Sequence, residues 1–365
     1  PIIGQSAASG AQVIDGSLKF DSVLKNHLEK DFSSDGNRRT WTWSSWVKKP
    51  EDEGFSDDGV IFEARIDSPS ADADIFGIRW RTNGRIIVYD TGNSYIGGTR
   101  EFRDTNAFYH LVLSVDTTQA SNNISLYVNG DLYLQGSYTQ NSDTRVNSSA
   151  ATHRIGARTT VGSQDGHFLS SQLSQCYLID GAALGPENFG FTDPLTNTWK
   201  PKKYKHRRDL YGVTWSSALV GDASGFQSAA LAADGFDGEV GTSNNQYAQN
   251  NTGSNPSTIT FTPVGGIKFN SSIQVYLINA ANTVNVNGEG AQTIAANEWV
   301  TVKTGSGTLN TLVFSRPTTG GASFAGIRVD GHILIDAQND NSFYLPFDGN
   351  SPIGKDQSGN GNDWT

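Results

Sequence analysis

Residues 108–134 read FYHLVLSVDTTQASNNISLYVNGDLYL, and apolar residues alternate with other residues through both ends of this stretch. Alternation with a period of two is typical of β-strands that bury one face. Asn129-Gly130 supplies the two residues with positive φ that a tight hairpin turn needs. We therefore predict two antiparallel strands that share one buried face. Its members are Leu111, Leu113, Val115, Ile124, Leu126 and Val128.

The same pattern continues in both directions along the chain. WTWSSWV at 41–47 has the period of a strand, and several more such runs follow between 257 and 336, with Asn287-Gly288 as a second hairpin signal. One turn of helix is expected within GAALGPENFGF at 181–191. Short strands with frequent turns and no long helix predict an all-β protein. We expect two antiparallel β-sandwiches of jelly-roll type in series.

Composition excludes several classes of protein. The chain has 365 residues, enough for two or three domains. Its net charge of −10 argues against binding to nucleic acid. No run of about 18 apolar residues occurs, so we expect no membrane insertion. The single cysteine, Cys176, allows neither an intrachain disulfide nor a multi-cysteine metal site.

Motifs for catalysis are missing from the sequence. It contains no His-Glu-x-x-His zinc helix and no Gly-x-Ser-x-Gly nucleophile turn. It also lacks the Glu-x-Asp-x-x-Glu strand with which sandwich-fold glucanases present their carboxylates. The consecutive acids at 51–53 alternate in direction and suit a solvated loop. We therefore expect no enzymatic activity.

Three aromatic residues are candidates for a glycan site. Trp80, Tyr89 and Tyr95 lie on or beside the predicted hairpin at 75–98, close to Arg and Asn residues. Aromatic rings stack on the C–H faces of sugars, and amides bind sugar hydroxyls. The alternative for each ring is packing in the core or on a sheet face.

An ordered set of motifs in the first half resembles a known family. These motifs are SLKFD (17–21), WTWSSWV (41–47), FYHLVLSVD (108–116), SLYVNGDLY (125–133), HRIGAR (153–158) and FLSSQLSQCYLIDGAALGPENF (168–189). Together they resemble a laminin-G-like, concanavalin A-like domain. The resemblance implies a β-sandwich over residues 15–195.

The second half resembles a galactose-binding-like or discoidin-like sandwich. AADGFDGEVGT at 232–242 is similar to that family's Asp-Gly-x-x-x-Thr turn, and FAGIRVDGHILID at 324–336 is similar to its last strands. The resemblance implies that Asp237 and Thr242 help to hold a structural Ca²⁺ ion. No other cofactor is expected.

Five segments follow from these patterns. They are an N-terminal docking segment (1–14), a laminin-G-like sandwich (15–195), a basic linker (196–212), a second sandwich (213–338) and the start of a further module (339–365). Six of the 27 basic residues lie within 200–208. This strip is expected to be a solvated linker, with docking of an acidic partner or of glycan phosphates as the alternative.

The series of modules resembles tail-fibre and other virion proteins of bacteriophages, especially those of cyanobacterial hosts. This resemblance implies a virion structural protein on the particle surface or tail, made in the host cytoplasm, which attaches the particle to a host-surface glycan. Its partners would be other virion proteins and further copies of itself, as a trimer in a fibre. A head decoration protein, a bacterial surface lectin and a polysaccharide depolymerase remain alternatives. The start PIIGQSAASGAQ, which lacks the pattern of a secretory signal, favours synthesis in the cytoplasm.

Overall fold

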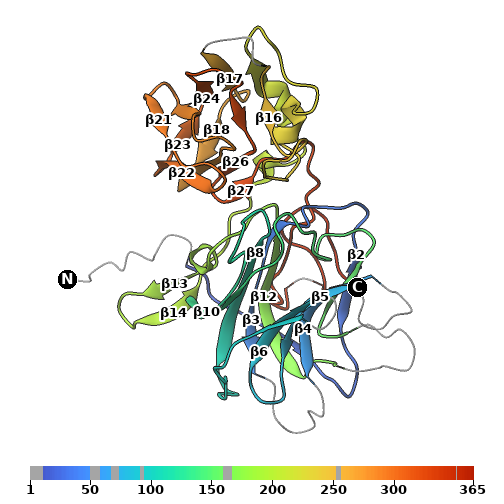
Figure 1. Ribbon diagram of the computed structural model, residues 1–365. Helices are drawn as coiled ribbons and strands as arrows, with labels where there is room; N and C mark the ends of the chain where they lie inside the picture. The colour runs from blue at the N-terminus through green and yellow to red at the C-terminus, as the bar shows by residue number, and fades with distance from the viewer. Residues whose placement is uncertain are drawn as a thin grey trace, which may run out of the picture.

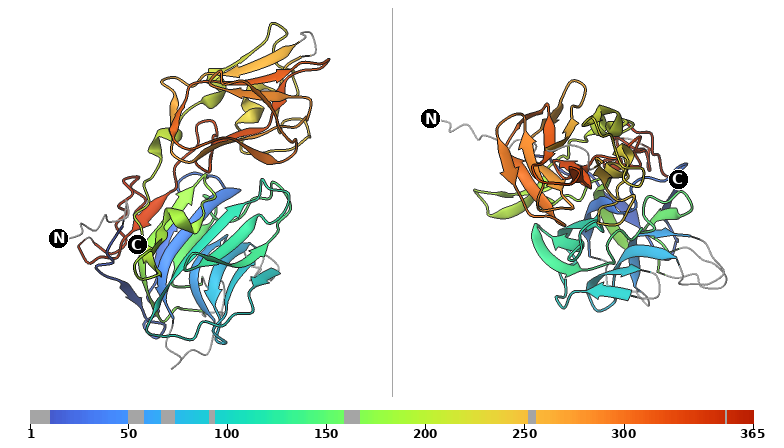
Figure 2. Two further views of the ribbon diagram at one scale, coloured as in Figure 1. Left: turned by 90° about the vertical axis from the view of Figure 1, so that its left-hand side faces the viewer. Right: turned by 45° about the horizontal axis from the view of Figure 1, so that its top comes forward.

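The computed structural model describes residues 11–49, 58–66, 74–90, 94–158, 167–251, 256–350 and 352–365. Their regular structure consists of β-strands and short 3₁₀ turns, which confirms the predicted all-β class. Two lobes lie one above the other, each built from antiparallel sheets (Figure 1; Figure 2, left). None of the helical turns in the described residues is long and apolar enough to cross a bilayer.

The first sandwich consists of two large sheets. Its seven-stranded sheet contains β1 (Leu18–Phe20), β12 (Ser171–Asp180), β3 (Thr40–Lys48), β8 (Phe108–Asp116), β9 (Ile124–Val128), β10 (Asp131–Gly136) and β28 (Phe343–Leu345). Its six-stranded sheet contains β2 (Leu28–Asp31), β11 (Thr152–Ile155), β4 (Gly59–Arg65), β5 (Ile75–Trp80), β6 (Ile86–Asp90) and β7 (Ser94–Gly97).

The predicted hairpin and its buried face are confirmed. Strand β8 pairs with β9 so that Leu113 faces Leu126, and Asn129 and Gly130 turn the chain with φ of 52° and 88°. All six predicted aliphatic residues lie in the core between the two large sheets. The expected helical turn is also present as η2 (Pro186–Asn188).

Strand β3 is buried on both faces, although its sequence alternates. Its outward-facing residues contact the chain that follows β12, since Thr42 Oγ1 donates to Ala182 O at 2.7 Å. Ser44 Oγ lies within hydrogen-bond distance of His110 Nε2, at 2.9 Å. The other ring nitrogen, Nδ1, accepts a hydrogen bond from Trp199 Nε1 at 2.9 Å. A second layer of chain thus covers this sheet and makes its outer face a small core of its own.

This layer corrects the expectation of a solvated linker at 196–212. Part of the segment forms the hairpin of β13 (Gly190–Asp193) and β14 (Thr198–Pro201). Trp199 anchors the hairpin by stacking on His110, and Leu210, in η3 (Arg208–Leu210), packs in the core of the second sandwich. Apolar residues spaced among the lysines hold the strip against both lobes.

The second sandwich has its own core and smaller sheets. A five-stranded sheet contains β15 (Leu219–Gly221), β17 (Ser257–Phe261), β24 (Leu312–Arg316), β20 (Thr283–Val286) and β21 (Ala291–Thr293). A four-stranded sheet contains β22 (Trp299–Thr304), β19 (Ser272–Tyr276), β26 (Gly326–Val329) and β27 (His332–Ile333). Two strand pairs, β16 (Ala248–Gln249) with β25 (Ser323–Phe324) and β18 (Ile267–Phe269) with β23 (Gly307–Leu309), and two 3₁₀ turns, η4 (Trp215–Ala218) and η5 (Ala232–Gly235), complete it.

The C-terminal segment differs from the prediction for 339–365. Instead of starting a further module, it completes the first sandwich: β28 pairs with β12, and Phe343 and Trp364 enter the first core. Thr365 also exchanges two backbone hydrogen bonds with Glu29, at the edge of the other large sheet. The physical reason is that one edge of β12 and part of the first core would otherwise stay open. Strand β1 pairs only with residues 171–173 of β12, so residues 176–178 are left to pair with β28.

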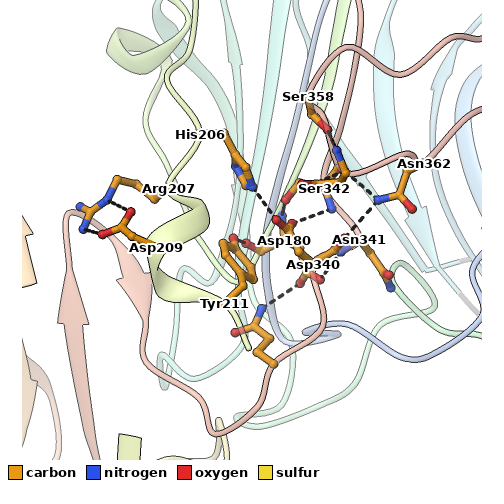
Figure 3. Close-up of polar contacts among 12 residues, drawn as sticks. Asp180, His206, Arg207, Asp209, Tyr211, Asp340, Asn341, Ser342, Ser358 and Asn362 are labelled. Carbon is orange, nitrogen blue, oxygen red and sulfur yellow. Dashed lines mark hydrogen bonds and ion pairs between the residues drawn. The ribbon is translucent and has the colours of Figure 1, made fainter. Parts of the chain in front are cut away.

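The second sandwich is therefore inserted between β12 and β28, and the chain leaves and re-enters the first sandwich at Asp180 (Figure 3). The buried carboxyl group of Asp180 accepts hydrogen bonds from the backbone N–H groups of Asn37 and Asn341, at 2.7 and 3.0 Å. Side-chain amides of Asn147 and Gln338 donate to it as well. Burial raises the pKa of this carboxyl to about 8.

A buried ion pair joins the two sandwiches directly. Arg328 of β26 contacts the Asp116 carboxylate at the end of β8 at 2.6 Å and donates to Thr118 Oγ1 at 2.8 Å. The Arg328 guanidinium carbon also lies 3.8 Å from the centroid of the Trp299 ring. The second sandwich thus rests on the first through this ion pair and through the hydrogen bond that Trp299 Nε1 donates to Thr118 Oγ1 at 3.0 Å, in addition to the covalent connections.

The described part of the predicted N-terminal docking segment packs on its own chain. Gln12 donates through its backbone N–H to Pro201 O at 3.1 Å, and its side chain reaches Gln175 and the hydroxyl of Tyr344. Residues 1–10 of that segment lie outside the described residues.

Replacement of Leu113 by Ala should lower the free energy of unfolding by about 2–5 kcal/mol, because a fully buried side chain leaves a cavity between the two sheets. Denaturant unfolding of the two proteins measures the difference. Leu132→Ala, in the exposed part of the same hairpin, is the control and should change stability by less than about 1 kcal/mol. Equal stability of L113A and wild type would contradict the assigned register.

Replacement of Trp364 by Ala should destabilise the first sandwich by about 3–5 kcal/mol, since this ring packs edge-on against Phe343 in its core. Hydrogen exchange of β3 and β12 reports the loss, and Ile353→Ala, at an exposed position of the same segment, is the control. Unchanged protection in W364A would mean that the C-terminal segment is a separate unit.

Candidate functional site

An open cleft of about 530 Å³ lies where the two sandwiches and the connecting strip meet. We call it the inter-sandwich cleft; its lining residues lie within 183–188, 202–207, 270–274 and 330–332. The first group follows β12, the second is the basic strip, and the other two belong to the second sandwich.

Backbone contacts fix the floor of this cleft. Ala182 forms an isolated antiparallel β-bridge with His332, and Ile333 N donates to Gly181 O at 3.0 Å. Gly331, at φ of 82°, occupies the turn between β26 and β27, and a Cβ there would lie 3.1 Å from Leu184. The two lobes can approach each other closely here because Gly331 carries no side chain.

Asp330 organises the wall that belongs to the second sandwich. Its carboxylate accepts the backbone N–H groups of Asn270, Ser271 and Ser272 at 2.8 to 3.2 Å. It also pairs with Arg207 at 2.8 Å, so that the strip is tied to this wall. The turn at 270–272 is thereby held with the Asn270 side chain exposed at the cleft.

The charges of the lining are mostly positive. Lys202, Lys203, Lys205 and Arg207 face two carboxylates, those of Glu187 and Asp330. Arg207 is fully engaged, since it also forms two hydrogen bonds with Asp209 and one with Lys268 O. The lysines therefore supply the available charge.

His332 lies buried at the back of the cleft. Its Nε2 is 2.9 Å from the hydroxyl of Tyr204, and its Nδ1 is 3.5 Å from that of Tyr211. Desolvation, with smaller contributions from His206 and Arg207, lowers the pKa of His332 to about 3. The imidazole is therefore neutral near pH 7 and acts as a hydrogen-bonding spacer.

The structure corrects two of the three predicted glycan-stacking residues. Trp80 is 1% exposed and packs edge-on against Phe102 and Tyr109 in the first core. Tyr89 is 2% exposed on the other face of the same sheet. Neither ring offers a free face to a sugar, because both sides of this sheet are covered. Tyr95 faces Tyr89 in the register of β6 and β7, and its side chain lies outside the described set.

Tyr89 instead belongs to a buried polar cluster that the sequence did not reveal. Its hydroxyl donates to Glu63 Oε2 at 2.5 Å, and the Arg79 guanidinium carbon lies 3.9 Å from its ring centroid. Burial raises the pKa of Glu63, while the arginines Arg158, Arg79 and Arg65 oppose that rise. Since Glu63 is completely buried, this cluster stabilises the sheet face and offers no open surface.

Asp237 and Thr242, the expected calcium ligands, are both exposed. Asp237 Oδ1 accepts the N–H of Glu239 at 2.8 Å. Partial desolvation in a crevice and the carboxylates of Glu239 and Asp234 raise the pKa of Asp237 to about 7. Within the described ranges no three His, Cys, Asp or Glu side chains gather as metal ligands. Two residues supply too few of the six to eight oxygens that Ca²⁺ prefers, so they do not form a calcium cage by themselves.

Only one wall of the cleft could be anticipated from the sequence, namely the basic strip at 200–208. Asn270 and Asp330 carry no local signal, because polar residues in hairpin turns are common in any β-protein. Their proximity depends on a pairing between segments 60 residues apart.

A known family model matches the first sandwich. Residues 25–182 match the Laminin_G_3 family, described as the Concanavalin A-like lectin/glucanases superfamily. This match agrees with the resemblance seen in the motifs of 15–195. No curated protein shows significant sequence similarity to the chain.

Several solved structures are similar at low identity. A heptameric SAP-like pentraxin from Limulus polyphemus is 17% identical, with a TM-score of 0.34, over 46% of this chain and 77% of its own. The CBM40 of a Ruminococcus gnavus IT-sialidase, bound to α2,3-sialyllactose, is 10% identical, with a TM-score of 0.30, over 45% and 87%.

Tailspike protein 2 from Escherichia coli O157:H7 bacteriophage CAB120 is 10% identical, with a TM-score of 0.33. The match covers 47% of this chain and only 23% of the tailspike. Similarities at this level carry no conclusion about ligand or activity.

The contribution of His332 to stability should fall as the pH drops from about 6.5 toward 3, because unfolded His332 takes up a proton that the folded state excludes. At pH 5 this single group should cost about 2 kcal/mol relative to pH 7. Denaturant unfolding across this range, compared between wild type and His332→Gln, isolates its contribution. Parallel pH profiles of the two proteins would show that His332 titrates normally in the fold.

Proposed function

We propose that this protein is a non-catalytic, glycan-binding structural protein of a bacteriophage virion, a tail-fibre or host-attachment component, and that glycan binds in the inter-sandwich cleft. The carbohydrate-binding, lectin-like fold of the first sandwich supports glycan binding. The virion role rests on the resemblance of the module series to tail-fibre proteins.

The observation that carries the proposal is the polar, open cleft beside the concanavalin A-like domain. Asn270 and Gln274 place amide groups on the wall of the second sandwich, and Asn188 places another on the wall that follows β12. Amides donate and accept at once, as do the hydroxyl groups of a sugar, so both partners can be satisfied together. A cavity of about 530 Å³ is within the range of small-ligand sites.

The carboxylates at the cleft support a binding role without hydrolysis. Glycosidases need two carboxyl groups, one as a proton donor and one as a nucleophile or base. Asp330 is engaged by Arg207 and three backbone N–H groups. Only Glu187, an exposed residue, remains, so the lining offers one carboxylate where the chemistry requires two.

Assembly on a particle belongs to the same proposal. The partners would be other virion proteins and identical copies, as a trimer in a fibre, since closed rings result when identical chains share one interface. Sedimentation of the isolated chain and identification of its neighbours in an assembled particle separate this role from head decoration and from a solitary bacterial lectin. A structural Ca²⁺ at Asp237 and Thr242 also remains a proposal, which melting with and without a chelator tests.

We expect the protein to bind host-surface glycans on an array and to release no reducing ends from host polysaccharide. Asn270→Ala with Gln274→Ala should weaken binding about tenfold, because two amide partners are lost. Asn106→Ala with Gln135→Ala, which removes two exposed amides outside the cleft, is the matched control and should bind as wild type does.

An array without any bound glycan would contradict glycan recognition. Release of reducing ends that disappears in Glu187→Gln would instead establish a depolymerase.

A further inference from the structure

The inter-sandwich cleft has an excess of positive charge, most of it from lysines. On a chain with a net charge of −10, four basic residues face two acidic ones in one cavity. A local positive potential on an acidic protein attracts anions to one place and repels them elsewhere. We propose that the glycan bound here is acidic and carries carboxylate or phosphate groups. This inference rests on the proposed function of the cleft.

Two of the four cations are already occupied. Arg207 is surrounded by Asp209, Asp330 and the carbonyl of Lys268. Lys202 Nζ donates to Glu187 O at 2.9 Å, which fixes that ammonium at the wall of the first sandwich. The two carboxylates neutralise the charge of Arg207, and the bond to a neutral carbonyl holds the Lys202 ammonium at that wall without neutralising it.

Lys203 and Lys205 are different. Both are exposed, and no carboxylate of the described residues lies within 4.0 Å of either ammonium. Lys203 Nζ lies 5.8 Å from the centroid of the Tyr344 ring, and this contact directs its stem without neutralising its charge. The two residues are therefore the free cationic groups of the cleft.

Their position relative to the amide wall defines the ligand class. The strip carries the lysines along one side, and Asn270 and Gln274 lie on the wall of the second sandwich. A ligand that fills the cleft meets positive charge on one side and neutral hydrogen-bonding groups on the other. An acidic saccharide carries anionic groups for the lysines and neutral hydroxyl groups for the amides on one molecule. Inorganic phosphate offers the anionic charge without the sugar hydroxyls.

The geometry of the strip is preset for such a ligand. Lys202 N donates to Phe189 O at 2.8 Å, and Tyr204 is held by its hydrogen bond to His332. Lys203 thus projects from a segment that is anchored at both neighbouring positions, and Lys205 follows the anchored Tyr204. Only their side chains need to be ordered on binding, which limits the entropic cost.

The test uses the full chain and titration calorimetry with four probes: tetragalacturonate, its methyl ester, glucose 6-phosphate and inorganic phosphate. Binding of tetragalacturonate or glucose 6-phosphate that weakens with salt, without binding of the methyl ester, is expected. Lys203→Gln with Lys205→Gln should weaken that binding by about tenfold or more, because two charge-assisted hydrogen bonds are lost.

Lys19→Gln with Lys25→Gln removes the same charge from exposed positions outside the cleft and should leave binding unchanged. Lys19 lines a separate hollow with Lys48 and Lys49, so a loss of binding in this control would place the anion there and overturn the proposal. All substituted side chains are exposed, and thermal melting verifies that both variants fold.

The remaining outcomes separate the two levels of inference. Equal binding of the ester and the acid would overturn the acidic class and leave glycan binding intact. Equal binding of inorganic phosphate and glucose 6-phosphate would overturn the saccharide part. Failure of every saccharide, here and on the array, would overturn the proposed function itself.

Discussion

The buried carboxyl group of Asp180 is the constraint on which the architecture depends. A polar group removed from water is costly unless hydrogen bonds compensate for the lost hydration. Asp180 obtains them from Asn37 and Asn147 of the first sandwich and from Gln338 and Asn341 of the returning chain. Gly36 permits this arrangement, because a Cβ there would lie 2.1 Å from Asp180 Oδ2. The chain must therefore return to the point that it left.

The cleft is a consequence of that closed path. Since both connections start from one end of β12, the second sandwich is held close to the first and touches it at several points. The β-bridge between Ala182 and His332 fixes one contact, and the pair of Arg328 with Asp116 fixes another. Breaking a buried pair of this kind is costly, so the orientation of the lobes resists change. The basic strip is joined to the first of these contacts by the hydrogen bond between Tyr204 and His332, and it forms one wall of the cavity.

Burial on both faces of the large sheets explains why the aromatic candidates are not a sugar platform. A sandwich with one solvated face would expose Tyr89 beside Arg79. Here the outer face of the six-stranded sheet carries a closed polar cluster with Glu63 at its centre. The outer face of the other sheet is covered by the hairpin of β13 and β14, through Trp199 and His110. The open cleft thus lies at the junction of the lobes and not on a sheet face.

The sequence by itself determined the strands, their turns and the inner face of the first sandwich, because alternation and Asn-Gly turns depend on residues that are neighbours in the chain. It also marked the basic strip at 200–208. It could not determine that β28 closes the first sandwich, because Phe343 must find a strand edge more than 160 residues away. Nor could it place Asn270, Asp330 and Lys205 around one cavity. Those relations depend on the docking of two lobes, and only tertiary structure decides which distant surfaces meet.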